Sequence, residues 1–93
     1  MTEAVQTTIR ALVELLDHDE DWDSYGASRI GLEGIIAAIR YVDSTFHDDA
    51  PAPSVVPTSG GGVQLEWHVD GVDREIEFSF HGAIVGCLLV PSD

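Results

Sequence analysis

The sequence contains no lysine and only four arginines, whereas aspartate and glutamate together number 17, which makes the formal net charge −13. Binding to nucleic acid or to an anionic membrane depends on lysine and arginine to neutralise phosphates. We therefore expect no direct binding to nucleic acid and no membrane association. The chain also lacks a run of 18 uninterrupted apolar residues and the basic start of a secretory signal peptide. These absences predict a cytoplasmic protein.

Cysteine is represented once, by Cys87, within the apolar run 84–90. A single cysteine cannot form an internal disulfide, which agrees with a cytoplasmic setting. The apolar neighbours favour Cys87 as a small buried side chain.

Metal-binding patterns are also missing. No cysteine and histidine spacing matches a zinc site. Alternating aspartates from Asp17 to Asp23 suggest a calcium loop, but the sixth position holds Trp22 and the twelfth holds Ser28, where an EF-hand needs glycine and glutamate. We expect neither a metal ion nor a cofactor.

The hydrophobic pattern predicts one α+β domain over 1–93, with a helical part at 1–47 and an antiparallel sheet at 54–90. Two helices are expected, over 2–17 and 29–46, the second capped by Ser28. The positions expected to face the core are Val5, Ile9, Leu12, Val13 and Leu16 in the first helix, and Ile30, Ile35 or Ile36, Ile39, Val42 and Phe46 in the second.

After residue 53 the period changes from 3.6 to 2, which predicts a three- or four-stranded meander with both helices on one face. The expected strands are 54–57, 63–69, 72–80 and 83–90. Asp70-Gly71 is a strong hairpin signal. A two-residue turn there pairs Trp67 with Arg74 as a cation–π contact, whereas a four-residue loop shifts the pairing by two positions.

Acidic residues gather at two places, which are our candidate partner-binding residues. The first group follows the first helix, where carboxylates oppose the helix dipole. The second occupies the outer sheet face, where either register puts carboxylates opposite one another at a cost in stability. The candidates are Asp17, Asp19, Glu20, Asp21 and Asp23 in the first group, and Glu66, Asp73, Glu75 and Glu77 in the second.

Two other readings of this acidity stay open. An acidic outer face is also typical of a solvated surface that discourages edge-to-edge aggregation. Halophilic and generally acidic proteomes give the same composition. The absence of lysine favours a functional reading, because soluble surfaces usually mix both signs of charge.

Catalysis is not expected. His68 faces Asp73 in the two-residue register, yet no nucleophile or oxyanion donor is evident nearby. A chain of this length also has little volume for a pocket. We therefore expect no enzyme.

The segments WDSYGA (22–27), PSVVP (53–57) and GGVQLEWH (61–68) resemble those of a family of small bacterial and phage proteins. The resemblance runs from residue 22 to about residue 80, and its motifs name no reaction. In size and acidity the chain is also similar to phage anti-CRISPR proteins that mimic DNA. That similarity implies a bacterial host cell as the place of action.

These features predict an acidic nucleic-acid mimic that inhibits a basic DNA-binding surface of a bacterial defence complex. By analogy with the anti-CRISPR proteins that the chain resembles in size and acidity, the expected partner is the DNA-binding subunit of a CRISPR surveillance complex. The alternative is an antitoxin or adaptor that binds its partner through Trp22 and Tyr25, since aromatic residues dominate many interfaces.

Overall fold

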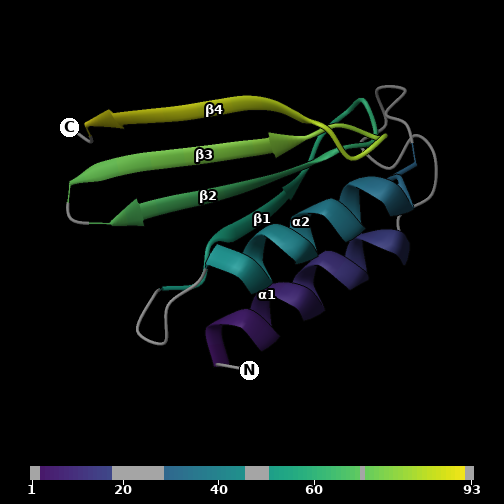
Figure 1. Cartoon of the computed structure of the whole chain (residues 1–93), viewed down its shortest axis with the longest axis horizontal. Coiled ribbons are helices and arrows are strands. Elements are labelled where there is room, and N and C mark those ends of the chain that lie inside the picture. The colour runs from purple at the N-terminus through teal and green to yellow at the C-terminus, as the bar shows by residue number, and fades with distance from the viewer. Residues whose placement is uncertain (1–2, 18–28, 46–50, 70, 92–93) are drawn as a thin grey trace.

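The computed structural model describes residues 3–17, 29–45, 51–69 and 71–91. Within these ranges, two α-helices precede one antiparallel sheet of four strands in the order β1-β2-β3-β4. Both helices lie on the same side of the sheet (Figure 1). The α+β prediction is thus confirmed. The elements are α1 (Glu3–Glu14), α2 (Leu32–Thr45), β1 (Ser54–Pro57), β2 (Val63–Val69), β3 (Val72–Phe78) and β4 (Ile84–Pro91).

The central hairpin has the register predicted for a two-residue turn. Val69 pairs with Val72, and Trp67 pairs with Arg74. Gly71 has a φ of +77°, the left-handed conformation that such a turn requires and glycine adopts without strain. The register of the four-residue loop is therefore excluded, and each side chain of β2 and β3 lies on the expected face.

The first helix buries Val5 and Leu12 as predicted, with Ile9 packed against the core, but the rest of its predicted stripe differs. The chain is α-helical to Glu14 and then tightens into a 3₁₀ turn over Leu15–Asp17. Val13 and Leu16 are exposed, so their assignment to the core was wrong. Thr8 and Leu15 take their places on the buried side, and the hydroxyl of Thr8 donates to the carbonyl of Ala4. The buried residues are Val5, Thr8, Leu12 and Leu15.

The second helix begins at Leu32, three residues later than the sequence suggested. Ile35 is buried and Ile36 is exposed, which decides between the two alternatives at this turn. Val42 is buried as predicted. The proposed cap Ser28 and the last stripe residue Phe46 lie outside the described residues.

Glycines allow the start of α2 to approach the sheet closely. The Gly31 amide donates to the carbonyl of Gly61 at 2.8 Å, which ties the helix to the β1–β2 turn. A Cβ at Gly34 would lie 2.6 Å from the Ser79 carbonyl oxygen, so only glycine fits there. These contacts fix the helices on one side of the sheet and leave the other side open. The core between them consists of Val5, Leu12, Leu15, Ile30, Ile35, Ala38, Val42, Val63, Leu65, Ile76 and Phe78.

The last strand lies at the edge of the sheet. Its register against β3 shifts at Glu77/Phe78, so that Phe78 pairs with Ile84 and Glu77 with Gly86.

The helices pack against β1, β2 and β3, and Cys87 on β4 is exposed. The prediction that Cys87 is buried was therefore wrong, because an apolar run can form an edge strand as well as a core strand.

Candidate functional site

The sheet face opposite the helices carries the carboxylates of the second predicted group. Along β2 and β3, core-facing residues such as Leu65 and Ile76 alternate with partly exposed polar ones. Strand alternation places the polar residues on the open face. We call this surface the acidic sheet face and define it by Gln64, Glu66, His68, Asp73, Glu75 and Glu77, with Gly86 and Leu88 beside them on β4.

Like charges face one another at the centre of this surface. Glu66 pairs directly with Glu75 across the two strands, which sets their Cβ atoms roughly 5 Å apart. Glu77 is two residues further along β3, or roughly 6.8 Å. Gln64 Nε2 donates to Glu66 Oε1 at 2.9 Å. Within the described ranges, neither Glu75 nor Glu77 has an ion-pair or hydrogen-bond partner for its carboxylate.

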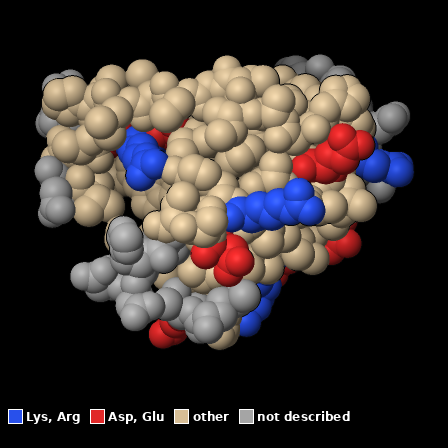
Figure 2. All heavy atoms as spheres, viewed as in Figure 1, with Lys and Arg blue, Asp and Glu red and all other residues tan. Residues whose placement is uncertain are grey.

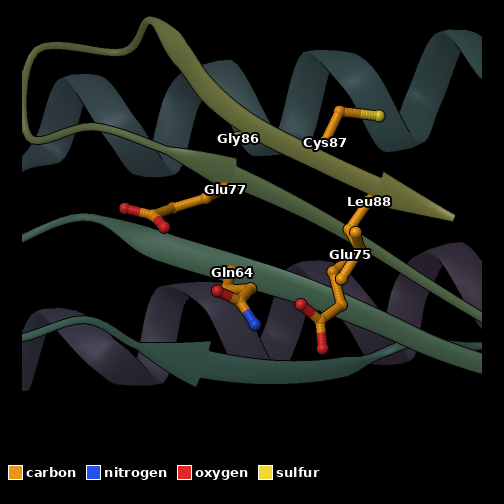
Figure 3. Close-up of a pocket in the computed structure, with 6 residues that line it drawn as sticks. All are labelled: Gln64, Glu75, Glu77, Gly86, Cys87 and Leu88. Atoms are coloured by element: carbon orange, nitrogen blue, oxygen red, sulfur yellow. The ribbon is translucent and has the colours of Figure 1, made fainter. Parts of the chain in front are cut away.

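A shallow hollow of about 80 Å³ opens between β3 and β4 on this face (Figure 3). Glu75 and Glu77 line it together with Leu88, and Gly86 leaves its floor open. A Cβ added at Gly86 would lie 3.6 Å from the Glu77 Cβ and 3.9 Å from Oε1, so the missing side chain keeps this carboxylate uncovered. Two carboxylates beside an apolar wall suit a cationic group on an aliphatic stem, as in arginine or lysine.

His68 and Asp73 form an ion pair at one end of the acidic sheet face. The Nδ1 and Oδ1 atoms are 2.6 Å apart. The hydrogen bond to Asp73, and then the negative charge of the same carboxylate, raise the pKa of His68 above its ordinary value of 6.5. Glu66 and Glu75 raise this pKa further by their charge. When it is protonated, the imidazole offsets part of the negative charge at this end of the acidic sheet face.

The arginine of the hairpin lies on the other side of the sheet. Arg74 stands 5.3 Å from the centre of the Trp67 ring, which confirms the predicted cation–π contact. Its guanidinium also donates to the hydroxyl of Tyr41 on α2. Of the other three arginines, Arg10 and Arg40 belong to the helices and Arg29 precedes α2. The acidic sheet face as defined therefore contains no arginine.

The structure brings the second predicted group of acidic residues together, and it describes only one residue of the first group. Glu66, Asp73, Glu75 and Glu77 come together on one face. Asp17 is exposed at the end of the 3₁₀ turn. The remaining members, Asp19, Glu20, Asp21 and Asp23, lie outside the described residues, as do Trp22 and Tyr25.

The contribution of β4 to the site was not predicted from the sequence. Gly86 and Leu88 reach the acidic sheet face because the register shift sets Gly86 opposite Glu77 and Leu88 opposite Glu75. An isolated glycine in an apolar strand was the available signal, since such a residue often marks a bulge or a close approach.

Other classes of site find no support in the part of the chain that the structure describes. It contains no group of histidine, cysteine, aspartate and glutamate side chains placed to hold a metal ion. None of its helices has the length and apolar character needed to cross a membrane. A scan against protein-family models found no match, and neither did searches of curated proteins and of solved structures.

Proposed function

We propose that the protein inhibits nucleic-acid binding by another protein, whose basic surface it occupies with its acidic sheet face. The observation that carries this proposal is the pair Glu75 and Glu77, whose carboxylates stand on one open face without partners among the described residues. A basic surface that normally binds phosphates supplies the missing partners. Ion pairs with this basic surface offset part of the repulsion between Glu66 and Glu75, which destabilises the folded protein.

The charge density supports a mimic of nucleic acid. The net charge of −13 over a longest dimension of 35 Å corresponds to one charge per 2.7 Å. Duplex DNA carries about one charge per 1.7 Å, which is the same order of magnitude. The carboxylates at alternate positions of β3 form a regular row, so the surface presents discrete contacts as well as a field.

The first target to test is the DNA-binding subunit of a bacterial defence complex such as a CRISPR surveillance complex. On this proposal the protein acts in the cytoplasm of a bacterial host cell, needs no cofactor and catalyses no reaction. Electrostatic attraction sets the rate of association, so the binding weakens steeply as salt rises.

Two triple variants of equal net charge test the proposal. The first, Glu66→Gln/Glu75→Gln/Glu77→Gln, neutralises the centre of the acidic sheet face. The second neutralises three exposed helix residues, Glu3→Gln/Glu14→Gln/Asp43→Asn. Each is immobilised beside the wild type and exposed to a lysate of bacteria that carry such a defence complex, and the bound proteins are identified by mass spectrometry.

The expected result is capture of a DNA-binding protein by the wild type and by the helix variant, with about tenfold weaker capture by the face variant. That loss corresponds to about 1.4 kcal/mol spread over three surface contacts. Equal loss in both variants would show that only the net charge matters. Equal retention would contradict the proposal. A third variant, Trp22→Ala, is captured in parallel, and a loss confined to it would favour the aromatic-anchor alternative.

The hollow beside Glu77 offers a test that leaves every charge in place. Gly86→Ala adds one methyl group to its floor at ordinary contact distance, so the fold is expected to tolerate it. If a basic side chain of the partner enters the hollow, this variant binds more weakly than the wild type. Unchanged affinity would mean that the carboxylates act only through their field.

A further inference from the structure

The edge strand β4 combines exposure with a complete absence of charge. Its eight residues contain no acidic or basic side chain, in a chain where charged residues make up 23%. Leu89 is the most exposed of its apolar residues at 69%. In Figure 1 the strand forms the side of the sheet farthest from the helices, and in Figure 2 the surface along it carries no charged side chain. The other exposed apolar residues of β4 are Ile84, Val85, Leu88 and Val90.

The opposite edge of the sheet is protected, which makes β4 stand out. β1 has only four residues and ends at Pro57, and short edge strands with proline discourage pairing with other chains. β4 is twice as long, and its proline, Pro91, is the last residue. Its register shift affects only the first part, so the segment 86–91 pairs regularly with β3. This segment presents an unpaired row of backbone groups.

We propose that β4 pairs antiparallel with β4 of a second copy of this chain, giving a continuous eight-stranded sheet. A strand that fits this edge must be apolar on both faces, because Leu88 and Leu89 project to opposite sides. Among the described strands, β2 carries Glu66 and β3 carries Glu75, and the uncharged β1 has only four residues and ends at Pro57, so β4 fits this edge best. Antiparallel pairing about a two-fold axis makes the strand its own complement.

Salt screens much of the repulsion between two negatively charged copies at this interface. Among the described residues, the carboxylates nearest to this interface stand on β3, and two β3 strands across it are three strand spacings, or about 14 Å, apart. That separation exceeds the Debye length of about 8 Å at physiological salt. Pairing leaves the two β1 strands as the outer edges, so the assembly closes at the dimer. Both acidic sheet faces then lie on the same side of the joined sheet.

The area of this interface is small. Eight residues extend over about 27 Å and a sheet is about 10 Å thick, so each copy covers roughly 270 Å². The total, about 540 Å², is below the 1,200 Å² or so of a standard interface. We therefore expect a reversible dimer that forms at high protein concentration.

Sedimentation velocity on the isolated protein tests the joint without any other partner, so its outcome is independent of the proposed function. Between about 10 μM and about 1 mM protein, the mass should rise from that of the 10.0 kDa chain toward twice that value. Leu89→Glu should keep the protein monomeric throughout. Leu32→Glu, at a residue of α2 that is 58% exposed, is the matched control and should dimerise like the wild type.

Hydrogen exchange on the wild type locates the contact without a variant. Amides of β4 should exchange more slowly at high concentration, whereas those of α1 and α2 should be unaffected. A wild type that stays monomeric at every concentration would overturn the proposal, and so would assembly beyond the dimer. Equal behaviour of Leu89→Glu and Leu32→Glu, or protection confined to the helices, would also overturn it.

Discussion

Replacing Glu75 by glutamine should stabilise the protein, although it alters a partly buried residue in the middle of the sheet. Glu75 faces Glu66 across the hairpin and has Glu77 as its neighbour along the strand. With charge separations of about 6 and 7 Å in water, the two repulsions amount to about 0.7 and 0.6 kcal/mol before screening. Screening at 0.1 M salt leaves about half of each, so the variant should gain about 0.7 kcal/mol.

Denaturant unfolding measures this gain, and a thermal melt should show a rise of about 3–5 °C for a domain of this size. At 1 M salt the Debye length falls to about 3 Å and the gain should shrink to about 0.2 kcal/mol. Glu33→Gln removes the same charge from the exposed first turn of α2, where a carboxylate favours the helix dipole. It should therefore destabilise the protein slightly.

The opposite signs of the two variants separate local repulsion from a general relief of net charge. A loss above about 1 kcal/mol in Glu75→Gln would refute the reasoning, because it exceeds the usual effect of a surface change and implies a structural partner for the carboxylate. A gain that persists at 1 M salt would show that the effect is not electrostatic.

Two further predictions concern the ion pair and the glycines. Because the pKa of His68 is raised, its pair with Asp73 should stabilise the fold fully below pH 6.5 and lose that effect as the pH rises through the raised pKa. An NMR titration should show a lower His68 pKa in Asp73→Asn and no change in Glu14→Gln; an unchanged value in Asp73→Asn would contradict this assignment. Gly62→Ala should cost about 3 kcal/mol or more in denaturant unfolding, because its Cβ would lie 2.1 Å from the Phe78 carbonyl oxygen. Gly86→Ala should stay within about 0.5 kcal/mol of the wild type, and equal effects of the two would refute the packing argument.

The hairpin could be predicted in detail from the sequence because two independent signals agree there. Asp70-Gly71 specifies a tight turn, and strict alternation along both strands fixes which side chains face the core. Together they determined the pairing of Glu66 with Glu75 and of Trp67 with Arg74. The acids of β2 and β3 in the candidate site followed from that register.

Features that depend on tertiary packing could not be predicted in this way. Helical periodicity leaves the buried stripe uncertain by one position, and the 3₁₀ turn after Glu14 brought Leu15 inward in place of Leu16. An apolar run has no alternation to show which face is covered, so Cys87 was assigned to the core. For the same reason, the sequence did not indicate that this apolar run forms an exposed edge strand, β4.

The central claim is that the acidic sheet face occupies a surface where the partner binds nucleic acid. Fluorescence anisotropy of a labelled DNA duplex bound to the captured partner tests this claim most directly. Wild-type protein and the helix variant Glu3→Gln/Glu14→Gln/Asp43→Asn should displace the duplex with equal potency, and the displacement should weaken as salt rises. The face variant Glu66→Gln/Glu75→Gln/Glu77→Gln should require about tenfold more protein. A duplex that stays bound while the partner also holds this protein, or equal displacement by the face and helix variants, would contradict the account.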